Sequence, residues 1–590
     1  MLPVPSYVRC EYFRRLIPRQ RVSKAMRILF FFAALSIPLC TGAATAEGGA
    51  GFVPGNTPLR PITGEWVGSI ELNGELIYLR IEFGSQETRH TVTVHSMMPG
   101  NSGTTTPVRQ RGRELRFELP GSSGTLKFSG EVCGAELAGS VTRHGQRGRF
   151  HLRRKAAIHP DLYDEYAGAY ELAPQEILYI RRGDRLTVNP PSTIEKSWLY
   201  FMNDSGRIRI LTPSSETTFY AGPTYLVPLP VEVEVTFVRD PNRKVTHLIW
   251  SEPASLSRIA PRTKLYREEE VRFTNGDVML AGRLLIPSGE GPFPAVVVVH
   301  GGGPANRNWE YQIVGDVFAR HGITALVYDK RGTGASTGDW REAGFDELAS
   351  DAAAAFEFLR TRSEIHPKQI GFWAISEGGW VAPIATTKVS DPAFLILVSA
   401  PGMAHPELDL LYIQETLKEG GFSETVIQQA LQFTQLWIEY ARTGRGWSHL
   451  EARIQSARNM EWFRFTELAY FGVVSQDDWF WRWYQRQAEH DPRPVLAKLQ
   501  CPVLAIYGAR DSNVPVEANK QALLAALEAG NVEYTLKIFP QGDHTLLETS
   551  SSALKDFVRI KSHVPGYFEV LIEWVRDRVQ AGSSPTAPLH

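Results

Sequence analysis

The first patterned stretch of the chain, residues 61–154, alternates apolar and polar positions. Between Asn73-Gly74 and the next turn, apolar side chains occur at every second position: Ile77, Leu79, Ile81 and Phe83. A period of two is typical of an antiparallel strand that buries one face. Glycine-rich turn signals recur about every ten residues. The pattern predicts a small all-β domain of barrel-like form over residues 47–158.

A second stretch with strand periodicity runs from Tyr163 to Arg262. Residues 231–238 alternate cleanly, and Arg182-Gly183-Asp184 has the composition of a hairpin turn. We expect a second β-rich domain over residues 159–265. Neither β-rich unit carries a cluster of residues suited to catalysis, so both are interpreted as accessory or substrate-shaping parts.

From Glu268 onward, strand patterns alternate with helical ones. The later apolar runs are continuous, as in strands of a parallel sheet buried on both faces. The expected strands are 271–273, 281–286, 295–299, 325–328, 370–373, 394–398, 503–507 and 534–539. This pattern predicts an α/β fold, a mostly parallel sheet flanked by helices, over residues 266–582, followed by a disordered tail at 583–590.

A mostly helical insertion, residues 405–494, separates the sixth and seventh of these strands. It is unusually aromatic, and residues 479–484 alone contain three tryptophans. Most of these rings must form the core of the insertion itself. We expect a few of them to line an apolar pocket.

The first 46 residues have the features of an export signal. Basic residues precede the apolar run 28–39, and Ala44-Thr45-Ala46 has the small-x-small form that signal peptidase cleaves. Met26 would itself start a compact signal peptide. We therefore expect an exported protein, periplasmic or secreted, with an uncleaved membrane anchor or a lipid on Cys40 as the alternatives.

Composition narrows the class of partner. The 590 residues carry 63 basic and 64 acidic side chains, so no polyanion such as nucleic acid is expected as a partner. The four cysteines show no CxxC spacing, which argues against a zinc site.

The most informative motif is Ala374-Ile375-Ser376-Glu377-Gly378-Gly379, which directly follows an expected strand. A serine flanked by small residues at a strand-to-helix turn projects its hydroxyl beyond the sheet edge. The common form of this motif has glycine where this chain has Ala374. Alanine is still small enough for such a turn, so Ser376 is the candidate nucleophile.

Two glycine-containing loops follow earlier strands. His300-Gly301-Gly302-Gly303-Pro304 can bring backbone N–H groups close to the serine. The second loop begins at Tyr328-Asp329-Lys330-Arg331. In it we expect Asp329 and Arg331 to fix the loop by ion pairing rather than to touch substrate.

The candidate acid and base come late in the chain. Asp511 follows the strand at 503–507, and His544 follows the last strand. An aspartate so placed can hold an imidazole in the tautomer that accepts a proton. Asp543 is a competing acid, but adjacent residues seldom point toward each other, so Asp511 is favoured.

In their order and spacing these four motifs resemble those of bacterial α/β-hydrolase esterases, which carry H-G-x-G-P, Y-D-K-R-G-x-G-x-S and S-x-G-G. That group is related to dienelactone-hydrolase-like and serine-aminopeptidase-like enzymes. The resemblance covers about half of the chain, from residue 266 to about residue 578. It implies an α/β-hydrolase fold in which the insertion at 405–494 covers the catalytic face as a lid.

The residues and the resemblance together predict a serine hydrolase. Ser376 would attack a carbonyl carbon and His544 would accept its proton, while the backbone N–H groups of Glu377 and of Gly302 or Gly303 would hold the oxyanion. No cofactor or metal is required. The expected partner is a small-molecule ester with an apolar acyl or alcohol part. Two alternatives are a serine peptidase or amidase, and a secreted binding protein whose hydrolase domain is vestigial.

Overall fold

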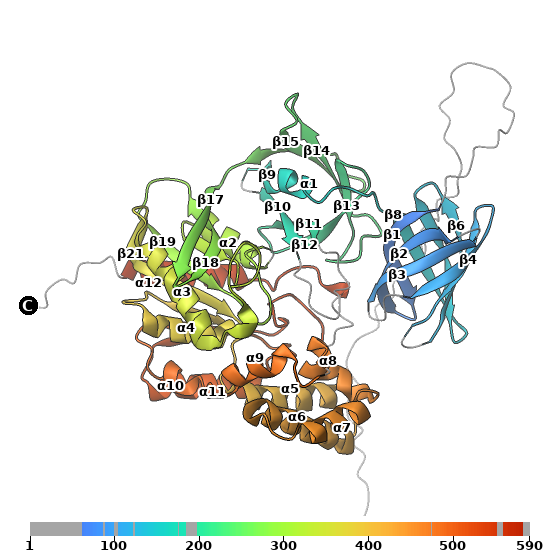
Figure 1. Cartoon of the computed structure of the whole chain (residues 1–590). Helices are drawn as coiled ribbons and strands as arrows, with labels where there is room; N and C mark the ends of the chain where they lie inside the picture. The colour runs from blue at the N-terminus through green and yellow to red at the C-terminus, as the bar shows by residue number, and fades with distance from the viewer. Residues whose placement is uncertain are drawn as a thin grey trace, which may run out of the picture. The chain divides into compact units, whose positions relative to one another are not determined.

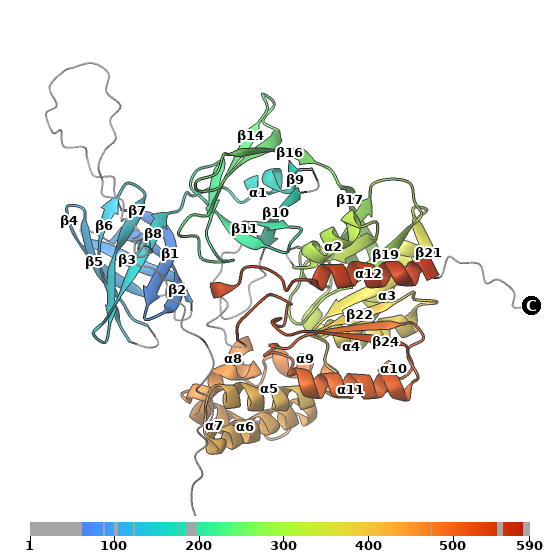
Figure 2. The same ribbon diagram turned by 180° about the vertical axis from the view of Figure 1, so that it is seen from behind.

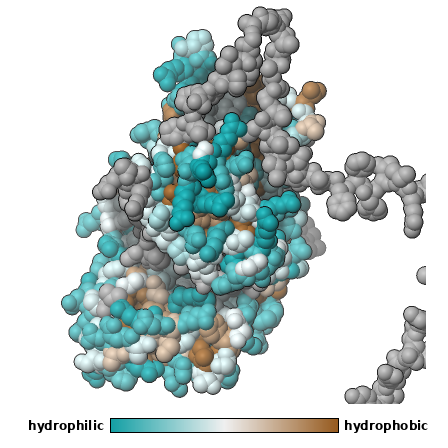
Figure 3. Space-filling view, turned by 90° about the vertical axis from the view of Figure 1, so that its right-hand side faces the viewer, coloured by the Kyte–Doolittle hydropathy of each residue, from teal (hydrophilic) through white to brown (hydrophobic). Residues whose placement is uncertain are grey.

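The computed structural model describes residues 62–86, 89–98, 104–121, 124–174, 176–184, 197–308, 310–473, 475–551 and 558–581. The expected export signal and C-terminal tail lie outside these residues. Among the residues described, no helix combines the length and the apolar character needed to cross a membrane. The face shown in Figure 3 is mostly hydrophilic, with smaller hydrophobic areas between the polar ones.

The first β-rich unit is a closed antiparallel barrel (Figure 1). Its strands are β1 (Gly64–Leu72), β2 (Glu75–Gln86), β3 (Arg89–Met98), β4 (Thr105–Arg111), β5 (Glu114–Leu119), β6 (Leu126–Cys133), β7 (Glu136–Arg143) and β8 (Gln146–Arg154). The alternating apolar residues, Ile77 to Phe83 among them, face inward and form one core. Trp66 belongs to this core, and its indole N–H donates to the Ile62 carbonyl over 2.9 Å.

The second β-rich unit is also a closed barrel, in which β16 pairs back onto β9. It comprises α1 (Leu162–Tyr166), β9 (Gly168–Ala173), β10 (Glu176–Asp184), β11 (Ser197–Asn203), β12 (Ile208–Pro213), β13 (Thr218–Ala221), β14 (Val233–Arg239), β15 (Val245–Ser251) and β16 (Arg258–Thr263). Tyr166 of α1 is fully buried against the barrel core, stacked on Phe237 with ring centroids 4.2 Å apart. The predicted β-rich character of both units is confirmed.

The remainder of the chain forms a mostly parallel sheet. Its strands are β17 (Tyr266–Asn275), β18 (Val278–Pro287), β19 (Phe293–Val299), β20 (Thr324–Tyr328), β21 (Ile365–Ile375), β22 (Leu395–Val398), β23 (Val503–Gly508) and β24 (Tyr534–Phe539). They lie in the order β17-β18-β20-β19-β21-β22-β23-β24. Only the β17–β18 and β18–β20 pairs are antiparallel among these neighbours. Each strand expected in this part of the chain is present, and the α/β fold is confirmed.

Helices cover both faces of this sheet (Figure 2). One face packs against α2 (Glu310–Arg320) and α12 (Tyr567–Ala581), and the other against α3 (Phe345–Arg360), α4 (Gly378–Lys388) and α11 (Val516–Ala529). In β19, Val296 and Val298 face the first pair of helices, whereas Val297 and Val299 face the second group. The continuous apolar run of β19 follows from this burial on both sides.

The lid, residues 405–494, is helical and has a core of its own. It contains α5 (His405–Glu419), α6 (Glu424–Thr443), α7 (Trp447–Ala457), η2 (Glu461–Phe465), α8 (Glu467–Phe471) and α9 (Trp479–Ala488), and α10 (Arg493–Leu496) begins at its end. Trp437, Phe480 and Tyr484 are buried within one cluster of mainly lid residues. Most of the aromatic residues therefore fill the lid rather than face a pocket.

The second barrel shares its outer packing with the mostly parallel sheet. Trp198, Tyr200 and Met202 of β11 belong to the same buried cluster as α2 and α12. The backbone N–H of Tyr225 donates to the Ile560 carbonyl over 2.7 Å. The outward apolar residues of this barrel thus complete the layer that covers one face of the sheet, and its accessory or substrate-shaping role stays a prediction.

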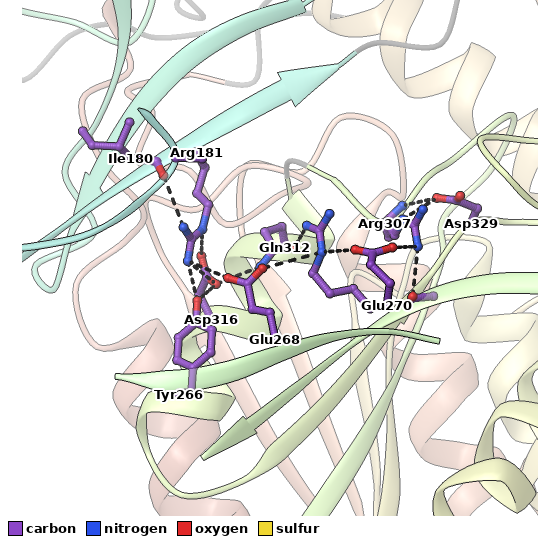
Figure 4. Close-up of polar contacts among 12 residues, drawn as sticks. Ile180, Arg181, Tyr266, Glu268, Glu270, Arg307, Gln312, Asp316 and Asp329 are labelled. Carbon is purple, nitrogen blue, oxygen red and sulfur yellow. Dashed lines mark hydrogen bonds and ion pairs between the residues drawn. The ribbon is translucent and has the colours of Figure 1, made fainter. Parts of the chain in front are cut away.

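A buried arginine joins the same barrel to the α/β domain (Figure 4). Arg181 of β10 forms an ion pair with Asp316 of α2, at 2.8 Å, and donates to the hydroxyl of Tyr266. The Asp316 side chain is 0% exposed and the Arg181 side chain 9%. Burial would lower the pKa of Arg181, but Asp316 and Glu268 outweigh it and hold that pKa well above its ordinary value.

Further ion pairs lead from this point toward the glycine loop (Figure 4). Glu268 lies between Arg181 and Arg283. Glu270 accepts from Arg283 over 2.9 Å and forms an ion pair with Arg307 at 2.7 Å. Arg307 belongs to the segment that follows Gly303, and its backbone N–H donates to Asp329 over 3.0 Å. The segment after the glycine loop is thus fixed by charged contacts.

Candidate active site

Ser376 occupies the turn between β21 and α4. Its φ angle is +55°, in the left-handed region that non-glycine residues rarely adopt. Its backbone N–H donates to the Val398 carbonyl over 3.0 Å, which holds the turn against β22. A serine in this conformation at a strand-to-helix turn has the geometry of a nucleophile elbow.

Close packing explains why the residues around Ser376 are small. A Cβ atom on Gly378 would lie 2.8 Å from the His300 carbonyl oxygen and 3.2 Å from the Ala374 methyl. A Cβ atom on Gly379 would lie 2.4 Å from the Ala400 methyl. The methyl group of Ala374 therefore occupies space that Gly378 leaves open. The departure from glycine at position 374 is compatible with the turn.

The candidate acid and base meet beyond the carboxyl ends of β23 and β24. His544 Nδ1 lies 2.8 Å from Asp511 Oδ2, and the Asp511 side chain is 0% exposed. The other oxygen of Asp511 accepts from the backbone N–H groups of Asn513, over 2.8 Å, and Val514, over 2.9 Å. Three hydrogen bonds thus fix the carboxylate, so it can orient the imidazole.

The charge balance around His544 favours its protonated form. Burial by itself would lower the pKa of the imidazole, but the Asp511 carboxylate, with smaller contributions from Asp543 and Glu310, outweighs it. The net effect raises the pKa of His544 above its ordinary value. A base of this kind accepts a proton more readily than a free histidine does.

Asp543 is held by its own loop. Its Oδ1 accepts from the backbone N–H groups of Thr545, over 2.9 Å, and Leu547, over 2.8 Å. Burial raises the pKa of Asp543. Of the two acids weighed from the sequence, the structure brings Asp511 into hydrogen-bond contact with His544.

The glycine loop lies against the Ser376 turn. A Cβ atom on Gly301 would be 3.4 Å from the Ser376 Cβ, and one on Gly302 would be 3.6 Å from the Glu377 carboxylate. The N–H of Gly301 donates to the Tyr311 hydroxyl over 3.0 Å. Within the described part of the chain, the N–H groups of Gly302, Gly303 and Glu377 meet no acceptor. The predicted oxyanion donors are therefore near one another and available.

His300, at the start of this loop, is a structural residue. Its Nε2 lies 2.5 Å from the Tyr328 carbonyl, which requires a proton on that nitrogen. Burial, reinforced by the nearby Lys330, lowers the pKa of His300 to about 3, so the ring is neutral and anchors the loop.

In the loop after β20, Asp329 and Arg331 form ion pairs as expected: Arg331 pairs with Asp351 over 2.7 Å, and Asp329 with Arg307 over 3.6 Å. Asp329 also accepts from the Ala335 N–H over 2.8 Å. Between them, the Lys330 ammonium reaches Glu377 Oε1 over 2.8 Å. The sequence did not single out Lys330, because nothing distinguishes this residue except its position between Asp329 and Arg331 in the motif.

The lid contributes a buried polar cluster that sequence reasoning also missed. The Tyr484 hydroxyl donates to Asp409 over 2.6 Å, and His405 Nε2 lies 3.7 Å from the same carboxyl group. Burial raises the pKa of Asp409, and burial together with Asp409 raises that of Glu467. His405 also lies against Trp380 of α4, with ring centroids 4.9 Å apart. The lid therefore contacts the helix that follows the candidate nucleophile.

No group of three or more His, Cys, Asp or Glu side chains suited to a metal ion occurs among the residues that the structure describes. The chemistry available at the site comes from Ser376, His544, Asp511 and backbone N–H groups. This set is suited to acyl transfer through a covalent serine intermediate.

Comparison with known proteins agrees with this fold. Residues 291–550 match the family described as serine aminopeptidase, S33. Esterase EstD of Thermotoga maritima is 24% identical over 306 residues, which are 50% of this chain and 64% of that protein. A thiohydrolase, aneE, of Aspergillus aculeatus is 36% identical over 122 residues, which are 20% of this chain and 36% of that protein. The chain thus spans less than two thirds of the length of these curated relatives.

Among solved structures, a dienelactone hydrolase from Anabaena variabilis aligns with a TM-score of 0.31 and 16% identity, over 54% of this chain and 99% of that one. A thermophilic esterase from Thermogutta terrifontis aligns with a TM-score of 0.32 and 18% identity, over 52% and 99%. In the order of its sheet strands and in its helical layers, the part of this chain from Tyr266 onward has the α/β-hydrolase fold, and within it residues 291–550 match the serine aminopeptidase family.

Proposed function

We propose that the protein hydrolyses carboxylic esters of small or medium, rather apolar acids through an acyl-enzyme intermediate. The observation that carries the proposal is the 2.8 Å contact between His544 Nδ1 and Asp511 at the edge of the sheet where Ser376 adopts its left-handed turn. The three residues occur along the chain in the order nucleophile, acid, base, which is the order of α/β hydrolases.

In this mechanism, the Ser376 oxygen forms a bond to the ester carbonyl carbon, and the hydroxyl proton moves to His544. The carbonyl oxygen becomes an oxyanion, which the N–H of Glu377 and that of Gly302 or Gly303 stabilise. The tetrahedral intermediate expels the alcohol, which takes the proton from His544. Water then attacks the acyl-enzyme with His544 again as base, and the free acid leaves.

An apolar ester is favoured over an amide by the surroundings of the site and by the esterase among the relatives. The lid next to α4 is rich in aromatic side chains, most of which fill its own core, and we propose that a few of them face the substrate. We therefore assign the acyl or alcohol part of the substrate to this side of the site. A serine peptidase or amidase remains the second candidate, because the matched family carries that description.

Labelling and turnover of the purified full chain test the proposal. A fluorophosphonate should modify Ser376, identified by mass spectrometry, and Ser376→Ala should lose both labelling and hydrolysis of p-nitrophenyl acyl esters. Faster cleavage of aminoacyl anilides than of esters would favour the peptidase. No labelling and no turnover would favour the binding protein with a vestigial domain.

We also propose that the protein acts after export, in the periplasm or outside the cell. The proposal rests on the basic and apolar pattern of residues 1–46. Cell fractionation followed by N-terminal sequencing tests it, and an unprocessed cytoplasmic chain would contradict it.

A further inference from the structure

The two halves of the expected oxyanion site come from distant parts of the sequence. Gly302 and Gly303 belong to the loop after β19, whereas Glu377 lies at the start of α4. Each half must be held so that its N–H points at the same oxygen, because a misplacement of about 1 Å at a catalytic site reduces rates about a hundredfold. What joins the two halves is therefore relevant to catalysis.

Lys330 is in contact with both halves. Its ammonium donates to the Gly301 carbonyl over 2.7 Å, to the Gly303 carbonyl over 3.0 Å and to Glu377 Oε1 over 2.8 Å. The side chains of Lys330 and Glu377 are 5% and 8% exposed. An ammonium has three protons, and here each has an acceptor. Lys330 therefore has no proton left for a substrate and acts through the groups that it holds.

The contact with the Gly301 carbonyl bears on one N–H in particular. A carbonyl and the N–H of the next residue belong to the same peptide group, so a cation on the Gly301 oxygen polarises the N–H of Gly302. The Gly303 carbonyl precedes Pro304, which has no N–H. The N–H of Gly301 already donates to Tyr311. Of the two candidate glycine donors, Gly302 is the one that Lys330 strengthens.

Lys330 also balances a charge beside the site. The Glu377 carboxylate lies 3.6 Å from the point where a Cβ on Gly302 would be. An unpaired carboxylate there would repel an oxyanion developing on the substrate, since charges interact strongly where water is excluded. The ammonium at 2.8 Å removes this repulsion.

We infer that Lys330 is a positioning residue for acyl transfer, which fixes and polarises the Gly302 N–H as the oxyanion donor and neutralises Glu377 beside it. The inference rests on the proposed function, because an oxyanion arises only if Ser376 attacks a carbonyl group. The inference also assigns the oxyanion donor of the glycine loop to Gly302 rather than to Gly303.

The test compares the full chain with Lys330→Met, Glu377→Gln and the double variant. Lys520→Met is the matched control, since it makes the same change in a surface pair whose carboxylate, Glu517, is 86% exposed. Two readouts are used: kcat and KM for a p-nitrophenyl acyl ester, and inhibition by an arylboronic acid. In the boronate adduct, the Ser376 oxygen adds to boron and its proton moves to His544, so the adduct imitates the anionic tetrahedral state.

Loss of an oxyanion donor lowers kcat by about 10²–10³. Because Lys330 acts on the donor indirectly, we expect Lys330→Met to lower kcat between about tenfold and a hundredfold, with KM within about threefold. The affinity for the boronate should fall by the same factor as kcat/KM. If Lys330 only maintained the fold, its replacement would not lower kcat and the affinity for the boronate by similar factors while KM stayed unchanged.

Lys330→Met alone can fail to fold, because it leaves the buried Glu377 carboxylate unpaired. The double variant removes both charges and therefore still tests the inference. We expect it to stay at least about tenfold below Glu377→Gln in kcat, since the Gly301 carbonyl has lost its cation. Equal kcat and equal boronate affinity in the double variant and Glu377→Gln would overturn the inference. If the unmodified chain neither reacts with a fluorophosphonate nor cleaves esters, it is the proposed function that fails.

Discussion

At the scale of single residues, the choice between two aspartates has a kinetic consequence. We expect Asp511→Asn to lower kcat by about 10⁴, because an amide beside His544 Nδ1 stabilises the wrong tautomer. Asp543→Asn should lower it by less than about tenfold, because an asparagine oxygen still accepts the Thr545 and Leu547 N–H groups. Steady-state kinetics of the two folded variants check this, and the reverse ranking would assign the acid role to Asp543.

The raised pKa of His544 predicts a pH dependence. The base must be neutral to accept a proton, so activity falls as the pH decreases through its pKa. Because the neighbouring carboxylates raise this pKa, the acid limb of kcat/KM should lie above the value of about 6.5 of a free histidine. The measurement is kcat/KM from about pH 4 to pH 9. An acid limb at a lower pH than the pKa of a free histidine would show that burial lowers the pKa of His544 more than the carboxylates raise it.

At the scale of secondary-structure elements, the prediction concerns the contact of β10 with α2. Arg181→Met should lower the free energy of unfolding by about 3–5 kcal/mol, because it leaves the buried Asp316 without its cation. Arg267→Met is the control: Arg267 is 58% exposed in its pair with Glu269, so we expect a loss of at most about 1 kcal/mol. Urea unfolding followed by tryptophan fluorescence measures both. Equal losses would mean that Arg181 contributes only as a surface ion pair does.

At the scale of the whole molecule, removing the first barrel should affect solubility and stability less than removing both barrels. A chain that starts at residue 159 loses a barrel that has a core of its own and few contacts with the rest. It should hydrolyse the test ester within about tenfold of the full chain. A chain that starts at Tyr266 also loses the aromatic side chains of β11 that pack with α2 and α12. It should be insoluble or unfold at a lower temperature, because an apolar layer is left exposed.

Solubility, circular dichroism and ester turnover of these two shortened chains test that difference. If the chain from Tyr266 were soluble with the unfolding temperature of the longer one, the second barrel would be the accessory unit that the sequence suggested. If the chain from residue 159 were inactive though folded, the first barrel would take part in the site.

The sequence by itself was sufficient for the α/β fold and for the candidate residues. The continuous apolar runs at 295–299 and 503–507 predict buried parallel strands, because a strand covered on both faces has no polar side. Ser376 and Asp511 were found because each follows such a strand, and His544 because it follows the last strand in the expected order. The parallel strands of such a sheet end at one edge, so residues that follow them lie near one another.

Only the tertiary structure decided which distant groups meet. Lys330 contacts Glu377, 47 residues away, and Arg181 contacts Asp316, 135 residues away. Neither pair has a local signature, since periodicity records which face of an element is buried but not what covers it. The same reason applies to the second barrel: the continuous apolar run of β11 indicates that both of its faces are buried, but it does not reveal that one face lies inside the barrel and the other against α2 and α12.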